Sequence, residues 1–149
     1  VLPHPLTTAL FAPVVTYACQ ILRVNIQKAV EPYDNTNPRA QTERVLANSK
    51  VDRLLAGKIG RLRAAEQNGW EASTVFLVGV VAAVFAKVDQ DATAQLALAF
   101  VLIRVLYNVV YVAFDKLLAG WARSGVWWCG GVCAARLLAL ASFALQEQA

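Results

Sequence analysis

ATAQLALAFVLIRVLYNVVYVAF, residues 92–114, is a run of apolar residues long enough to cross a lipid bilayer as a helix. Arg104 stands near its middle, where an unpaired charge is costly. A helix through this run aligns Arg104, Tyr107 and Tyr111 on one stripe, at positions i, i+3 and i+7. We therefore expect Arg104 to face a protein interior, where the stripe begins a functional site.

The rest of the chain shares this apolar character. Of its 149 residues, 58% are hydrophobic and 16% are charged, which is too apolar a balance for an ordinary soluble domain. Four runs have the length of a membrane span: residues 6–24, 67–85, 92–114 and 125–145. The sequence predicts an all-α integral membrane protein whose single domain, residues 1–149, contains four transmembrane helices.

Other fold classes fit the pattern less well. A soluble four-helix bundle needs polar outer faces, and VFLVGVVAAVFA at residues 75–86 has none. No alternation of period two indicates a β-barrel. The first apolar run lacks a basic flank or an obvious cleavage site, so we expect a retained span and not a signal peptide.

The charge distribution predicts an orientation. Eight cations lie between the first two runs, whereas the second connection has Lys87 beside Asp89 and Asp91. The positive-inside rule then places the first and third connections in the cytosol and both termini outside or in a lumen. Acidic residues are interspersed among the cations, so we expect no nucleic-acid partner.

The cysteines and the histidine do not predict a metal site. Cys19, Cys129 and Cys133 lie in or at the edges of apolar runs, and we expect reduced thiols that pack in the protein. His4 is the single histidine of the chain, so a zinc-type ligand set lacks partners.

Turn formers divide the chain into helices. EPYDNTNPRA at residues 31–40 contains two prolines and should end the first helix, and helical character resumes at residue 41. The short connection at residues 87–93 makes the second and third spans antiparallel neighbours.

Pairs of small residues four positions apart predict close helix packing. They are Gly69 with Ser73, Gly79 with Ala83, and Gly130 with Ala134. Trp70, Trp121, Trp127 and Trp128 fit an interfacial aromatic belt.

A second set of polar residues accompanies the Arg104 stripe. Arg61, Asn68 and Glu71 fall at positions i, i+7 and i+10 of the helix that contains the second span, which puts them on one face. An ion pair between Glu71 and Arg104 would satisfy both charges, because either one left unpaired in lipid is costly. One glutamate cannot neutralise Arg61, Arg104 and Arg123 together, and this surplus also fits an anionic guest.

Four motifs, in order, resemble those of the MAPEG superfamily, the membrane-associated proteins in eicosanoid and glutathione metabolism. They are DNTNPRA at residues 34–40, RLRAAEQNGWEA at 61–72, RVLYNVVY at 104–111 and RSGVWW at 123–128. The resemblance covers nearly the whole chain. It implies a homotrimer of four-helix protomers that holds glutathione between subunits near the cytosolic side, with a lipophilic substrate entering from membrane lipid.

The resemblance also implies roles for particular residues. Carried over by position, the contacts to glutathione are Arg39, Asn68, Glu71, Arg104, Tyr107, Tyr111 and Arg123, and Arg61 joins them as part of the predicted face. Arg123 and Ser124 would lie nearest the thiol, where stabilising the thiolate supplies a nucleophile. Without glutathione, Glu71, Tyr107, Tyr111 or Arg123 would serve as acid, base or anion clamp.

The chain departs from the family pattern in three places. Ala64 stands where many members have an arginine, Ser73 and Thr74 follow in place of an aromatic or aliphatic residue and proline, and the connection from Tyr111 to Arg123 is longer. Three functions therefore stay open: a glutathione-dependent transferase or isomerase, a glutathione-independent isomerase or cyclase, and a non-catalytic lipid-binding protein. In a eukaryote the expected location is the endoplasmic reticulum membrane. Arg136, deep in the last run, has no counterpart in the motifs.

Overall fold

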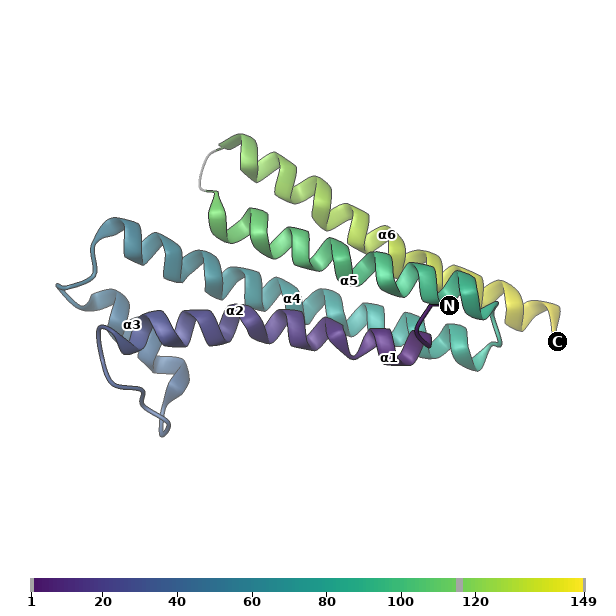
Figure 1. Ribbon diagram of the computed structural model, residues 1–149, viewed down its shortest axis with the longest axis horizontal. Coiled ribbons are helices and arrows are strands. Elements are labelled where there is room, and N and C mark those ends of the chain that lie inside the picture. Colours follow the sequence, from purple (N-terminus) through teal and green to yellow (C-terminus); the bar gives the residue numbers. More distant parts are fainter. Residues whose placement is uncertain (1, 115–116, 149) are drawn as a thin grey trace.

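The protein is a bundle of long antiparallel helices (Figure 1). The computed structural model describes residues 2–114 and 117–148, without the side chains of Arg39 and residues 117–119. Its helices are α1 (Pro5–Ala9), α2 (Phe11–Lys28), α3 (Pro38–Ala47), α4 (Arg53–Phe85), α5 (Gln90–Ala113) and α6 (Leu117–Glu147). No strand occurs within these ranges, which confirms the predicted all-α class.

Four helical segments are long and apolar enough to cross a membrane. They are Pro5–Lys28, which joins α1 and α2, then Arg53–Phe85, Gln90–Ala113 and Gly120–Glu147. Each one contains or closely overlaps a predicted span. The α4 helix is longer than its predicted span because the helix-forming sequence before residue 67 continues into it without a break.

Polar side chains at helix starts fix where the helices begin. The Asn37, Asp52 and Asp89 side chains accept hydrogen bonds from the backbone N–H groups of the first turns of α3, α4 and α5, at 3.3, 2.8 and 2.8 Å. Such caps satisfy donors that a helix end otherwise leaves unpaired. The predicted breaks after the first span and between the second and third spans are thereby confirmed.

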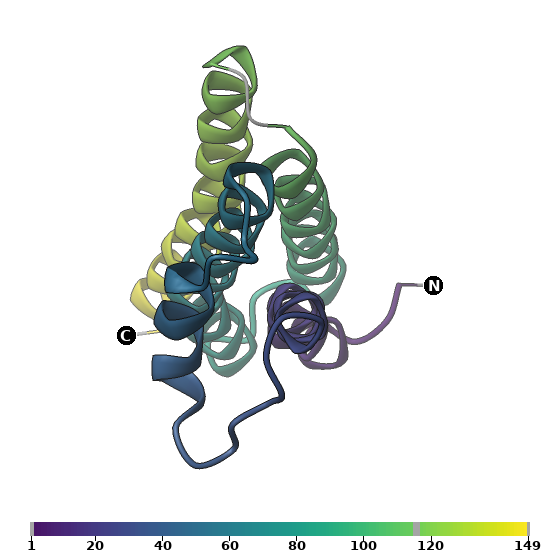
Figure 2. The same ribbon diagram turned by 90° about the vertical axis from the view of Figure 1, so that its left-hand side faces the viewer.

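The connections gather at the two ends of the bundle. At one end lie α3 with the loop before it, the last turn of α5 and the first turns of α6, and at the other end lie both termini and the α4–α5 turn (Figures 1 and 2). Helix α4 packs against α2, α5 and α6. Its Phe76 ring stacks on Phe100 of α5 at a centroid distance of 3.9 Å, in a core that includes Leu137 of α6.

Two of the predicted small-residue contacts bring helices into close approach. A Cβ atom on Gly69 would lie 2.7 Å from the Cγ2 and Oγ1 atoms of Thr16 on α2. A Cβ atom on Gly79 would lie 3.2 Å from the carbonyl oxygen of Ala134 on α6. Gly130 is less restricted, because its nearest contact would be 3.5 Å, to Ile103. Gly69 and Gly79 thus let α4 approach its neighbours on both sides.

We predict that Gly69→Ala destabilises the protein although alanine is the better helix former. Overpacking costs about 1–3 kcal/mol, which exceeds the gain of about 1 kcal/mol in helix propensity. Gly60→Ala is the matched control, since it lies on the same helix with no neighbouring atom within 4 Å of its added Cβ. Thermal unfolding in detergent should give a lower Tm for Gly69→Ala than for Gly60→Ala. The reverse order would contradict the close-approach role of Gly69.

Candidate functional site

The Arg104 stripe forms a continuous stack of cations and aromatic rings. The Cζ atom of Arg104 lies 4.3 Å from the centroid of the Tyr107 ring, and the rings of Tyr107 and Tyr111 meet edge to face at 5.3 Å. Arg123 of α6 ends the stack, with its Cζ atom 4.1 Å from the Tyr111 centroid. A guanidinium over an aromatic face is attracted by the ring quadrupole. We call these four residues the Arg–Tyr ladder.

The ladder shows how the stripe is arranged. Arg104, Tyr107 and Tyr111 share one face of α5, as the helical period predicted, and Arg123 of α6 lies beside it despite the longer connection. Ser124, next along α6, is exposed and donates a hydrogen bond from Oγ to the carbonyl oxygen of Gly120 at 3.2 Å. The predicted thiol-activating pair therefore lies at the outer end of the ladder.

Arg104 is the buried end of the ladder. Its side chain is 3% exposed, and its Nη2 atom has no hydrogen-bond partner among the described residues. The predicted ion pair with Glu71 does not form within the protomer. Glu71 is exposed, and its Oε1 atom accepts a hydrogen bond from Gln67 at 3.3 Å. The pairing hypothesis was wrong because spacing along two helices fixes faces and depths, but not the rotation that makes them meet.

Asn68 and Glu71 lie on α4, which packs against α5. The Asn68 amide donates to the carbonyl oxygen of Ala64 at 2.9 Å, one turn earlier in its own helix. Asn68 is half-buried and Glu71 is exposed, and neither side chain hydrogen-bonds to a residue of the ladder. The structure thus brings Arg104, Tyr107, Tyr111 and Arg123 together and leaves Asn68 and Glu71 on the neighbouring helix.

Glu71 also lines a polar pocket of about 600 Å³ formed by α2, α3 and α4. Tyr17 and Trp70 meet edge to face in its wall, with ring centroids 4.9 Å apart. Trp70, predicted as an interfacial anchor, therefore also contributes to a pocket. Glu71 therefore belongs to this pocket, to which the four residues of the Arg–Tyr ladder contribute no lining.

An ion pair at the base of this pocket was missed by sequence reasoning. Arg23 of α2 donates from Nε and Nη2 to the Glu66 Oε2 atom, at 3.2 and 2.7 Å, and from Nη1 to the Thr42 hydroxyl at 2.7 Å. Both charged side chains are mostly buried. The available signal was a single cation near the end of the first apolar run, Arg23, and an acid directly before the second run, Glu66.

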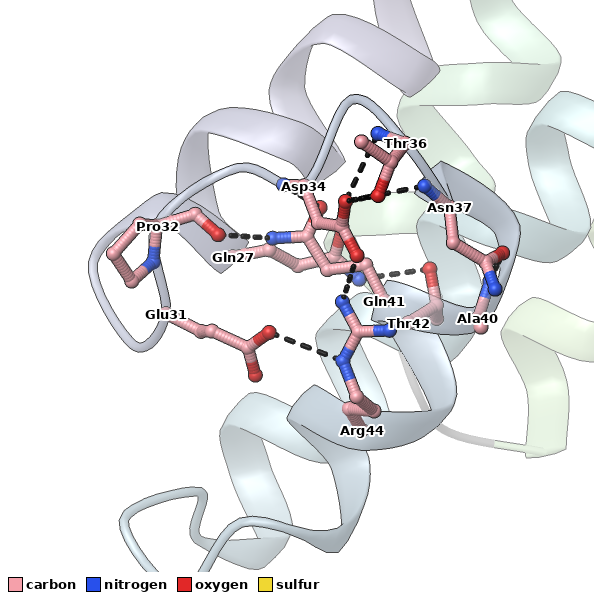
Figure 3. Close-up of polar contacts among 10 residues, drawn as sticks. All are labelled: Gln27, Glu31, Pro32, Asp34, Thr36, Asn37, Ala40, Gln41, Thr42 and Arg44. Atoms are coloured by element: carbon pink, nitrogen blue, oxygen red, sulfur yellow. Dashed lines mark hydrogen bonds and ion pairs between the residues drawn. The ribbon is translucent and has the colours of Figure 1, made fainter.

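The loop before α3 is held by Asp34 (Figure 3). Its Oδ1 atom accepts hydrogen bonds from the Thr36 hydroxyl and from the backbone N–H groups of Thr36 and Asn37. Its Oδ2 atom accepts from Arg44 Nη2 at 2.8 Å, and Arg44 also donates to Glu31. These bonds, led by the one from the Thr36 hydroxyl, lower the pKa of Asp34 from 3.8 to about 2.

This anchored loop supports one wall of the pocket. Gln41 of α3 donates from Nε2 to the carbonyl oxygen of Pro32 at 3.1 Å, and the Gln27 amide of α2 donates to the Thr42 hydroxyl at 3.0 Å. Tyr33 and Thr42 then line the pocket opposite α4. The DNTNPRA motif thus orders a pocket wall.

The remaining predicted residues are dispersed. Arg61 lies with Lys58 in a separate groove between α2, α4 and α5, so it does not join Glu71 in one pocket. Arg39 belongs to the first turn of α3, and its side chain lies outside the described residues. Arg136 is exposed on α6.

Four spans that enclose charged and aromatic side chains define an integral, multi-pass membrane protein. No curated protein and no solved structure matches the chain. The family model described as MAPEG family matches residues 5–144, and the chain belongs to the MAPEG family. It is therefore related to membrane glutathione transferases and isomerases, a family that also has non-catalytic members.

We predict that the loop before α3 loosens in acid. Folding lowers the pKa of Asp34, so its ionised form stabilises the folded loop. This stabilisation is complete above pH 3.8, decreases as the pH falls, and is lost below about pH 2. Cleavage by an acid protease within residues 29–37 should accelerate over this interval, relative to an unstructured peptide of the same sequence.

Two variants, each of which removes one carboxylate, test this prediction. Asp34→Asn should be cleaved rapidly throughout the interval, with little further dependence on pH. Asp91→Asn removes the charge of an exposed acid in the first turn of α5, and this variant should behave like the unmodified protein. Equal protection of the Asp34→Asn and unmodified loops at pH 5 would contradict the anchoring role.

Proposed function

We propose that this protein binds glutathione at the Arg–Tyr ladder and uses its thiol on a small lipophilic substrate, as a transferase or an isomerase. The observation that carries the proposal is the unpartnered Nη2 atom of buried Arg104. A guanidinium donor out of contact with water calls for an acceptor. Glutathione carries two carboxylates that can accept from it.

Each group at the site has a role in this proposal. Arg104 would bind a carboxylate, Tyr107 and Tyr111 would donate or accept through their hydroxyls, and Glu71 would pair with the amino group of the tripeptide. Asn68 would contact the peptide backbone, and Arg39 would contribute from the loop side. Arg61 is left out because it lies in the other groove.

Arg123 and Ser124 would act on the thiol at the outer end of the ladder. A nearby guanidinium lowers the pKa of a thiol because it stabilises the thiolate, which is the nucleophile. The hydroxyl of Ser124 would donate a hydrogen bond to the same sulfur. The exposure of this end gives a lipophilic substrate a path from the bilayer.

We also propose that three protomers assemble around three such sites. In one protomer Glu71 faces outward and its pocket stands apart from the buried end of the ladder, so a neighbouring copy would enclose the tripeptide. Family members are typically trimeric. The first and third connections would face the cytosol, and native mass spectrometry would count the subunits.

The binding prediction concerns Arg104. Arg104→Gln should weaken glutathione binding by about tenfold to a hundredfold, as expected for the loss of a charged hydrogen bond. Isothermal titration of the detergent-solubilised protein measures this effect. Lys50→Gln removes the same charge from an exposed position beyond α3 and should bind normally.

Two outcomes would count against the glutathione site. Normal binding by Arg104→Gln would exclude the ladder as its location. No binding by the intact protein would remove the cofactor, and would favour a glutathione-independent isomerase or cyclase or a non-catalytic lipid-binding protein. Ala64, in place of the arginine of many family members, favours these alternatives because the carboxylates of glutathione lose one cationic partner. Turnover of a lipophilic substrate without glutathione would distinguish the enzyme from the binding protein.

The chemical prediction concerns Arg123. Arg123→Gln should leave glutathione bound but lower the fraction present as thiolate, since the cation beside the sulfur is removed while Arg104 remains. Ultraviolet absorbance of the thiolate during a pH titration measures that fraction directly. Ser124→Ala should have a smaller effect in the same direction. An unchanged thiolate titration in Arg123→Gln would place the sulfur elsewhere.

A further inference from the structure

A groove of about 630 Å³ runs between α2, α4 and α5, and no residue of the ladder or of the polar pocket is among its lining residues. Its walls are apolar and include Val15 and Leu22 of α2 and Val105 and Val109 of α5. Leu22 and Val109 are 44% and 55% exposed, so the groove is open on the outside of the bundle. It shares no lining residue with the pocket that holds Glu71.

Three polar side chains interrupt these apolar walls. Lys58 and Arg61 lie one turn apart on α4, and neither forms an ion pair within the part of the chain that the structure describes. The Nε atom of Arg61 is buried without an acceptor. None of the described residues that line the groove is acidic. The groove therefore combines two cations with no acidic residue of its own.

Asn108 lacks a hydrogen-bond donor to its Oδ1 atom, whereas Arg61 lacks an acceptor for its Nε atom. The Asn108 Nδ2 atom donates to the Val15 carbonyl oxygen at 3.0 Å, which fixes the orientation of the amide. Its Oδ1 atom is buried and has no donor. A buried orphan donor and a buried orphan acceptor in one groove are each costly. A ligand that both accepts and donates would satisfy the two together.

The cations lie at the depth of lipid headgroups. Helix α4 has 33 residues, about 50 Å at 1.5 Å per residue, so it exceeds the roughly 30 Å hydrocarbon core. Lys58 and Arg61 are in its second and third turns, near the end of the bundle where α2 and α5 also terminate. The walls at Val15 and Val105 continue from there toward the bilayer centre.

We propose that this groove binds one anionic phospholipid from the surrounding membrane. Its phosphate accepts hydrogen bonds from Lys58 and Arg61, and a headgroup hydroxyl donates to the Asn108 Oδ1 atom. One acyl chain lies along the apolar walls of α2 and α5. Phosphatidylglycerol has the negative charge and the hydroxyls that these groups need. The proposal does not depend on glutathione binding.

The test is a competition between two lipids. The full-length protein is placed in nanodiscs that contain equal amounts of phosphatidylglycerol and phosphatidylcholine with the same acyl chains, and native mass spectrometry counts the lipid it retains. Phosphatidylglycerol should be retained in preference. Lys58→Gln and Arg61→Gln should each lower that preference about fivefold, the usual contribution of one cation beside an anionic lipid.

The control variant is Arg53→Gln, which removes an exposed cation from the same end of α4 outside the groove and should keep the preference. If Arg61→Gln does not fold, Val109→Trp provides a second test: its ring fills the groove and should abolish retention. Glycerol 3-phosphate, which has the headgroup chemistry without an acyl chain, should not displace the lipid.

Several outcomes would overturn the proposal. Equal retention of the two lipids would show that the cations recognise no phosphate. An equal loss of lipid preference in Arg53→Gln would show that general surface charge, and not the groove, causes the preference. Absence of retained lipid together with a changed subunit count in Val109→Trp would show that a second copy of the chain fills the groove.

Discussion

This structure depends on one constraint. A polar group that has no hydrogen-bond partner is costly in free energy where water is absent. This cost explains why the backbone forms long helices, whose hydrogen bonds are all internal. The same cost acts on the side chains within the spans. Arg104 lies over an aromatic ring, Arg23 pairs with Glu66, and the Asn68 and Asn108 amides donate to backbone carbonyls. The contacts of Arg23 with Glu66 and of Asn108 with Val15 join different helices, so they fix a relative rotation that apolar packing alone leaves undefined.

A few polar atoms remain without a partner after this pairing. In the described residues they are the Arg61 Nε, Arg104 Nη2 and Asn108 Oδ1 atoms. They fall in two regions, the Arg–Tyr ladder and the groove between α2, α4 and α5. We propose a different ligand for each region, a water-soluble tripeptide anion at the ladder and an anionic lipid at the groove.

Much of the fold could be predicted because its main signals are local. The length of an apolar run decides whether it spans a bilayer, and prolines with turn formers decide where the first helix ends. The stripe through Arg104 was also predictable, because the helical period alone fixes which residues share a face. The helical period does not predict the ion pair between Arg23 and Glu66. It also does not predict that Glu71 and Arg104 fail to form one. Both depend on contacts between helices whose mutual rotation one sequence does not specify.

The sequence by itself determined the membrane class, the four spans, the α3 loop and the composition of each helical face. Only the tertiary structure decided that Arg123 completes the ladder, that Arg61 belongs to a different groove from Glu71, and that Arg104 retains an unpaired donor. The physical reason is the range of the forces involved. Hydrophobic length and helical period act within one segment, whereas the partner of a buried charge is chosen by the packing of several helices at once.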